Sequence, residues 1–133
     1  MIIGTVGAVV GKVMRVRPHP NAHKLWLVDA CLDSNRTEIQ IVFGGVRKLH
    51  RGELVAVAPP GARVIVMGRD KPKKVRIRSY RGERSHGMLC SLTELGWVNA
   101  SMDEVAVLQG LRPGQSLDEV APEERPAHVK NWC

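Results

Sequence analysis

The apolar residues of the chain recur at the short intervals that are typical of β-strands. Between Val6 and Val16 they alternate loosely with small and basic residues, which predicts one long strand, bulged at its glycines. Pro18 and Pro20 end this strand, because proline has no N–H to donate to a neighbouring strand. The same reasoning predicts shorter strands at residues 25–28, 38–43, 54–58, 62–66 and 105–108.

Turn and helix signals separate these strands. Polar or proline-glycine turns are expected at residues 33–35 and 59–61. Capping boxes at residues 91–94 and 116–119 predict two short helices, the first closed by Gly96. Many short strands with only short helices favour an all-β fold, a small closed or nearly closed barrel.

Residues 74–78 alternate strictly between basic and apolar side chains. The alternation predicts a strand with Val75 and Ile77 on one face. The other face would then carry a basic stripe formed by Lys74, Arg76 and Arg78.

Composition is that of one globular domain. The chain has 133 residues, of which 44% are hydrophobic and 25% charged. No apolar run approaches the roughly 20 residues that a membrane span needs, and the start has no signal-peptide layout. The three cysteines form no CxxC pair, so neither a disulfide framework nor a zinc site is indicated, and Cys31 and Cys90 are expected to be buried. We therefore expect a cytoplasmic domain that does not associate with membranes.

Charge is the strongest compositional signal. The formal net charge is +7, and residues 1–93 alone hold 17 basic and six acidic residues. The basic residues form three groups: one at Lys12, Arg15, Arg17 and Lys24, one at Arg47, Lys48 and Arg51, and one within residues 69–84. Such a surface indicates a polyanionic partner, most commonly a nucleic acid backbone.

No arrangement of residues indicates catalysis or metal binding. His19 and His23 have helical spacing, but the prolines beside His19 disfavour a helix and no third ligand is near. We expect them in a turn whose exposed histidine and Asn21 contact a ligand or cap the loop. Ser85 and His86 are adjacent, so on an extended chain their side chains point apart and cannot form a nucleophile–base pair. The chain is therefore predicted not to be an enzyme and to need no cofactor.

Residues 81–88 have a composition suited to contact with a partner. Gly82 and Gly87 let the backbone turn tightly and approach another molecule. Ser85 can donate to a phosphate or a base edge, and Met88 offers a flexible apolar contact. Three arginines, Arg78, Arg81 and Arg84, suit bidentate phosphate contacts.

Three ordered stretches resemble the tRNA-binding domain family. They are G-K-V to V-D at residues 11–29, which includes P-H-P-N-A-H-K-L, then Q-I-V to P-P-G-A at 40–62, and R-G-E-R-S-H-G-M-L-C-S at 81–91, continued by E-L-G. The third stretch looks most like the N-terminal tRNA-binding domain of the bacterial phenylalanyl-tRNA synthetase β-chain. The resemblance implies a five-stranded OB-fold barrel with short accessory helices, here over residues 1–121, followed by a C-terminal tail at 122–133.

The resemblance also implies binding to the outside of tRNA through shape and backbone contacts. By motif position it places Ser85 and Met88 near the RNA, with neighbours at Lys12, Asn21, Lys24, Arg78 and Arg81, and the charge map agrees. The predicted RNA-binding residues are Lys12, Asn21, Lys24, Arg47, Lys48, Lys74, Arg76, Arg78, Arg81, Arg84, Ser85 and Met88. The shortage of aromatic residues (three Trp, one Tyr and one Phe) suits folded RNA better than stacked single strands.

The chain departs from the family at two places. His23 stands where the family usually has Asp, and the loop at 44–52 lacks the usual Asn and is one residue longer. Because the chain begins almost at the barrel and no aminoacylation site follows, we expect a free-standing tRNA-binding protein without catalysis. Two alternatives stay open: a peptide-binding or export chaperone on the same barrel, and an accessory subunit that docks on an aminoacyl-tRNA synthetase through its acidic C-terminal part. A homodimer is also left open, while the charge favours RNA as the partner.

Overall fold

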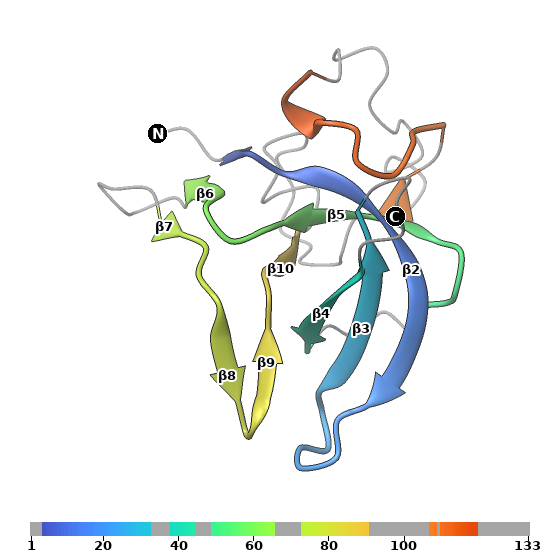
Figure 1. The fold of residues 1–133 in the computed structure, drawn as a ribbon, viewed down its shortest axis with the longest axis vertical. Helices are drawn as coiled ribbons and strands as arrows, with labels where there is room; N and C mark the ends of the chain where they lie inside the picture. The colour runs from blue at the N-terminus through green and yellow to red at the C-terminus, as the bar shows by residue number, and fades with distance from the viewer. Residues whose placement is uncertain are drawn as a thin grey trace, which may run out of the picture.

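The part of the chain that the structure describes folds into antiparallel β-sheets and a single 3₁₀ turn (Figure 1). The structure, a computed structural model, describes residues 4–32, 38–44, 49–65, 73–90, 107–108 and 110–119. Within these ranges the elements are β1 (Gly4–Val6), β2 (Val9–Pro18), β3 (Trp26–Cys31), β4 (Glu38–Phe43), β5 (Leu54–Ala58), β6 (Arg63–Ile65), β7 (Lys73–Lys74), β8 (Arg78–Tyr80), β9 (Glu83–Ser85), β10 (Met88–Cys90), β11 (Val107–Leu108) and a 3₁₀ turn at Leu117–Glu119.

The main sheet has the strand order β10-β5-β2-β3-β4, with β11 also paired to β5. A second sheet has the order β1-β6-β7, and β8 and β9 form a separate hairpin. β2 connects the parts of the main sheet, because its first half pairs with β5 and its second half with β3. Its register against β3 shifts between Val13 and Arg15. A bulge increases the local twist of a strand, which suits a strand that passes from one neighbour to another.

The single strand predicted over residues 6–16 is therefore two strands. Gly7, with a φ of 91°, separates β1 from β2. The irregularity within β2 lies between Val13 and Arg15, not at a glycine as the sequence suggested. Other predictions are confirmed: β4 and β5 have the expected bounds, and β2 ends at Pro18.

Hydrogen bonds connect β4, an edge strand of the main sheet, to the segment that contains β9 and β10. Residue His86 donates its backbone N–H to the Gln40 carbonyl at 2.8 Å. The backbone N–H of Val42 donates to the Ser85 hydroxyl at 2.9 Å, and that hydroxyl donates to the Gly87 carbonyl at 2.8 Å. The Ser85 side chain thus takes the place of a backbone acceptor at the point where regular strand pairing stops.

The core lies on both sides of β5. Val55 and Val57 belong to one cluster of buried side chains, which includes Val13, Val28 and Ile41. Residues Ala56 and Ala58 of the same strand belong to a second cluster, with Val10, Val64, Val75, Cys90 and Leu117. A strand covered on both faces reads as a continuous apolar run, which explains the sequence Leu-Val-Ala-Val-Ala. Cys31 and Cys90 are both buried, as predicted.

The strictly alternating segment at 74–78 does not form one strand. Val75 is 7% exposed, and its backbone N–H and carbonyl pair with Ala62 and Gly61 at 2.8 and 2.9 Å. Beyond this point the chain leaves β6 and enters the β8–β9 hairpin. Ile77 is 51% exposed as a result, so the prediction of one strand with Val75 and Ile77 on the same face is wrong.

The remaining predictions concern the turns and the later elements of the chain. The turn at 59–61 is confirmed, since Ala62 donates its N–H to the Pro59 carbonyl at 3.0 Å. The second capping box leads into the 3₁₀ turn at Leu117–Glu119, and the last strand includes Val107 and Leu108. The turn at 33–35, the helix expected from residue 91, residues 105–106 and the tail at 122–133 lie outside the described residues. Within the described part of the chain, no helix has the length and apolar character to cross a membrane.

Gly87 is predicted to be essential for the closure of the sheet. Its φ is 129°, and an added Cβ would lie 2.6 Å from the Ala58 carbonyl oxygen. Gly52 is a matched control, because its φ is 94° and nothing lies within 4 Å of an added Cβ. We expect Gly87→Ala to lower the free energy of unfolding by about 1–3 kcal/mol more than Gly52→Ala, as overpacking adds to backbone strain. Urea denaturation measures the difference, and equal losses would contradict the role of the close contact.

Candidate nucleic-acid interface

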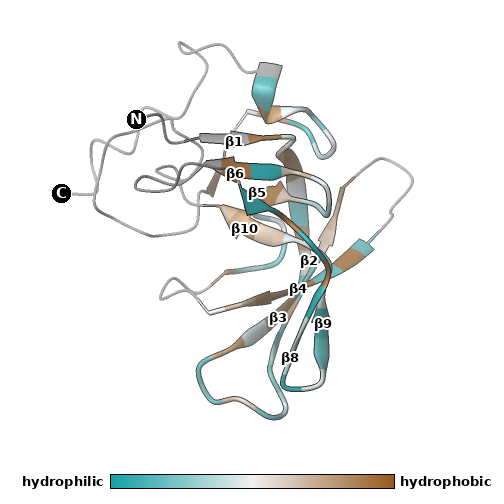
Figure 2. Cartoon of the chain, turned by 90° about the vertical axis from the view of Figure 1, so that its left-hand side faces the viewer, coloured by the Kyte–Doolittle hydropathy of each residue, from teal (hydrophilic) through white to brown (hydrophobic). Residues whose placement is uncertain are grey.

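The β8–β9 hairpin is a projecting, polar part of the molecule. Its strands pair Arg78 with Ser85 and Tyr80 with Glu83, and residues 81–82 form the turn. Arg81 and Gly82 have φ values of 50° and 90°. Two successive left-handed residues match the right-handed twist of a two-residue hairpin, and glycine adopts this conformation without steric cost. Figure 2 shows hydrophilic colour along this hairpin, in contrast to β5 and β10.

The turn at residues 19–25 holds the tip of this hairpin. Nδ1 of His19 accepts the backbone N–H of Asn21 at 2.9 Å, so its other ring nitrogen, Nε2, carries the hydrogen that is donated to the Tyr80 carbonyl at 2.8 Å. The Asn21 side-chain amide donates to the Arg81 carbonyl at 3.1 Å. Both turns lie at the lower end of the molecule in Figure 1. We call these contacts the His19–Asn21 latch.

The latch changes the interpretation of two residues. His19 is 6% exposed, so the expectation of an exposed histidine is wrong at this position. Its ring caps the loop, which was the other role considered for this turn. Asn21 is exposed, but its side-chain nitrogen is used by the Arg81 carbonyl.

A hollow of about 510 Å³ lies where the two turns meet. It is lined by Asn21, Ala22, His23, Lys24, Leu25 and Arg81. Lys24 and Arg81 bring two cations to it from segments far apart in the sequence. Such a concave, positively charged surface suits a phosphate group.

A second, smaller groove runs along the hairpin and β10. Its volume is about 60 Å³, and its lining comprises Val64, Lys73, Lys74, Val75, Arg76, Arg78, Tyr80, Gly87 and Met88. Four of the predicted RNA-binding residues, Lys74, Arg76, Arg78 and Met88, therefore meet at one place. We call this surface the basic groove.

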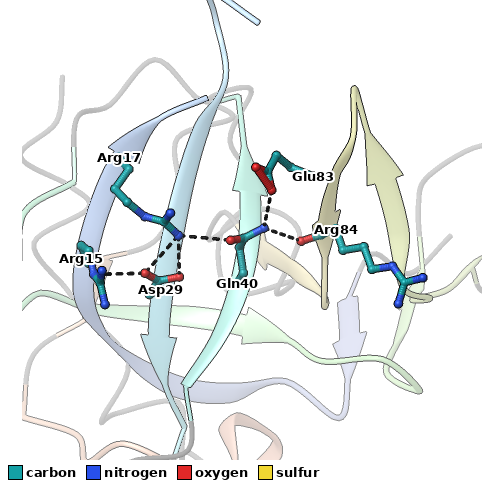
Figure 3. Close-up of polar contacts among 6 residues, drawn as sticks. All are labelled: Arg15, Arg17, Asp29, Gln40, Glu83 and Arg84. Atoms are coloured by element: carbon teal, nitrogen blue, oxygen red, sulfur yellow. Dashed lines mark hydrogen bonds and ion pairs between the residues drawn. The ribbon is translucent and has the colours of Figure 1, made fainter. Parts of the chain in front are cut away.

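A polar network joins the hairpin to the main sheet (Figure 3). Asp29 on β3 is 9% exposed and lies 3.3 Å from the guanidinium of Arg15 and 3.2 Å from that of Arg17. Arg17 also donates to the Gln40 side-chain oxygen at 3.1 Å. The Gln40 amide in turn donates to the Arg84 carbonyl at 3.0 Å and contacts the Glu83 carboxylate at 3.4 Å. Two arginines of the first basic group therefore serve structure, because they balance a nearly buried carboxylate.

Ser85 differs most from its predicted role. Its side chain is 2% exposed, and both hydrogen-bonding functions of the hydroxyl are used within the protein. The hydroxyl therefore fixes β9 against β4 and does not face solvent.

The remaining predicted residues are dispersed. Lys12 and Arg84 are exposed but line neither the hollow nor the basic groove. Residues Arg47 and Lys48 lie outside the described residues. In the described ranges no three His, Cys, Asp or Glu side chains are grouped so that they could hold a metal ion.

Two exposed residues of the basic groove, Lys73 and Tyr80, were not singled out from the sequence. Lys73 belongs to the basic run at 69–84, but its place next to the hairpin depends on its pairing with Val64 of β6. Tyr80 is 42% exposed and lines the groove beside the cations. The sequence feature that could have indicated Tyr80 is its position directly before the Arg81-Gly82 turn.

Known proteins that are similar to this chain include one family of domains and one kind of enzyme subunit. The family described as "Putative tRNA binding domain" matches residues 8–115. The chain is 37% identical over 123 residues to the phenylalanine–tRNA ligase beta subunit of Symbiobacterium thermophilum, covering 88% of this chain and 13% of that protein. It is 44% identical over 96 residues to the same subunit of Halalkalibacterium halodurans, covering 72% of this chain and 11% of that protein. The subunit of Geobacillus kaustophilus is 43% identical over 95 residues, 70% of this chain and 11% of its own length. The chain thus spans only a small part of the curated relatives that it matches.

The Ser85 hydroxyl is predicted to stabilise the fold. Ser85→Ala removes the acceptor of the Val42 N–H, and we expect the free energy of unfolding to fall by about 1–3 kcal/mol. Ser79→Ala, an exposed serine in the same hairpin, should change it by less than about 0.5 kcal/mol. Thermal or urea denaturation of both variants makes the comparison. Equal stability of the two variants would show that the bridge contributes nothing.

Proposed function

The chain belongs to the tRNA-binding domain family, and from that premise we propose that it binds tRNA through the β8–β9 hairpin and the adjoining turn at 19–25, without catalysis of its own. One observation carries the proposal. Lysines and arginines from separate segments of the chain line the hollow and the basic groove, and both surfaces adjoin the same hairpin. The predicted contacts are Lys24, Lys74, Arg76, Arg78, Arg81 and Met88.

The proposed mode of binding is recognition of folded RNA by its backbone. Lys24 and Arg81 stand at the hollow, while Lys73, Lys74, Arg76 and Arg78 line the basic groove. An array of this kind contacts several phosphates at once and reads the shape of the RNA, not its sequence. The His19–Asn21 latch supports this mode, because a fixed hairpin tip loses less conformational entropy when it binds.

We further propose that the main sheet is the five-stranded barrel of an OB fold. Five strands follow one another in the order β10-β5-β2-β3-β4, and the last of them is bridged to the β9–β10 segment by Ser85 and His86. This arrangement supports a nearly closed barrel whose projecting hairpin carries the binding surface.

A second candidate function is association with a synthetase. The similarity to beta subunits of phenylalanine–tRNA ligase favours it, since the chain matches one segment of those larger proteins. Sedimentation of the chain alone and with a phenylalanine–tRNA ligase reports both a homodimer and a mixed complex. No change in sedimentation upon mixing would exclude stable docking.

Binding of bulk tRNA is the direct test of the main proposal. Fluorescence anisotropy between about 50 and 200 mM salt should show a steep fall of affinity with salt, because bound phosphates release counterions. Duplex DNA should compete poorly with tRNA. Displacement of weakly bound tRNA by an unfolded peptide would instead support the chaperone alternative, and binding of neither would contradict both.

Arg78 and Arg81 are predicted to contribute directly to the affinity. Arg78→Ala or Arg81→Ala should weaken tRNA binding by roughly 1–3 kcal/mol and reduce the slope of log affinity against log salt by about 1. Arg112→Ala removes the same charge from an exposed residue of the 110–119 segment, at the opposite end of the molecule in Figure 1, and is the matched control. Equal affinities for all three variants and the unchanged protein would place the interface elsewhere.

A further inference from the structure

Tyr80 is an exposed aromatic residue among cations. Val6, Ile77 and Tyr80 are the large apolar residues exposed in the described part of the chain, and only Tyr80 lines the basic groove. Its neighbours there include Met88 and the cations Lys74, Arg76 and Arg78. A ring that served only to fill the core would be covered, whereas 42% of this residue is exposed.

We propose that Tyr80 and the basic groove form a subsite for one unpaired nucleobase of the bound RNA. The proposal rests on the proposed function and deepens it, because it states which part of the RNA meets the groove. The base stacks on the exposed tyrosine ring, and the flanking phosphates lie against the surrounding cations. Folded RNA that offers an unstacked base is then preferred over a continuous duplex.

The hairpin fixes the backbone of Tyr80 in place before RNA binds. The Tyr80 carbonyl accepts a hydrogen bond from His19, and the residue pairs with Glu83 across the hairpin. Strand alternation places Tyr80 on the same face as Arg78, two residues earlier. A platform whose backbone is held on two sides loses little entropy when a base stacks on it.

The chemistry of the groove favours a nucleobase over an apolar peptide segment. A base offers a π-face that stacks on the tyrosine ring. The negative charge of its phosphate neutralises cations of the groove, which are Lys73, Lys74, Arg76 and Arg78. Met88 adds a polarisable side chain that adapts to an aromatic edge. The nearest acid across the hairpin, Glu83, is directed to the Gln40 amide at 3.4 Å.

The size of the groove determines how the base lies. Its volume of about 60 Å³ makes it a shallow groove that does not enclose a base. The base therefore lies on the outer face of Tyr80, with at most an edge group reaching into the groove. Stacking of this kind accepts any of the four bases, because each has a π-face.

Two labelled RNA duplexes test the proposal. They have the same paired sequence, and one carries a single additional unpaired nucleotide. By fluorescence anisotropy, the full chain should bind the bulged RNA about tenfold more tightly than the fully paired RNA. This ratio corresponds to the free energy that stacking of one base on an aromatic side chain usually contributes to binding. Tyr80→Phe should keep this preference, and Tyr80→Leu should reduce the ratio of the two affinities to less than about twofold.

A charge variant separates stacking from electrostatics. Arg78→Gln should weaken binding of both RNAs to a similar extent and lower the salt slope, with the preference for the bulge kept. In a second readout, 2-aminopurine at the unpaired position should lose fluorescence on binding the unchanged chain or Tyr80→Phe, but not Tyr80→Leu. Thermal melting confirms that each variant is folded.

The outcomes distinguish the two proposals. Equal binding of both RNAs by the unchanged chain, or a full preference in Tyr80→Leu, overturns the nucleobase subsite. In either case salt-dependent binding of tRNA would leave the proposed function in place. If neither RNA nor tRNA binds, both proposals fail.

Discussion

The closure between β4 and the β9–β10 segment is the constraint on which the rest of the structure depends. Regular pairing of strands stops here, and the gap is bridged by one backbone hydrogen bond from His86 and by the hydroxyl of Ser85. Because the hydroxyl both accepts from Val42 and donates to Gly87, it satisfies two backbone groups with one side chain. Gly87 makes this possible, as its Cα lies too close to the Ala58 carbonyl for any side chain. The motif S-H-G is thus explained by geometry within the fold, and its effect on a partner is indirect.

The same closure determines where the hairpin points. A hairpin of two short strands is only marginally stable on its own in water. Here it is held at its base by Ser85, on its side by Gln40 and at its tip by the His19–Asn21 latch. These contacts come from β4 and from the turn between β2 and β3. The projecting element of the molecule is consequently fixed by the main sheet, and its cations keep a defined arrangement.

The many cations of the chain divide into two kinds. Arg15 and Arg17 lie against Asp29, which balances their charge within the network on the outer side of β2, β3 and β4. The cations of the basic groove line one surface together with Tyr80 and Met88. Like charges so close together repel, and an anionic partner relieves that repulsion. A map of charge along the sequence does not separate these two kinds, since both consist of lysine and arginine in short runs.

Local patterns in the sequence determined much of the fold. The continuous apolar run of β5, the bounds of β4 and the Pro-Pro-Gly turn depend on residues that are close together in the chain, and each was predicted correctly. The resemblance of three ordered motifs was likewise enough to indicate the family. Only the tertiary structure decided that Ser85 and His19 are buried, that Ile77 is exposed, and that Tyr80 lies among the cations. The physical reason is that alternation reports two faces of a strand but not what covers them: Ser85 is covered by β4, and His19 by the hairpin tip, through contacts between residues more than 40 positions apart.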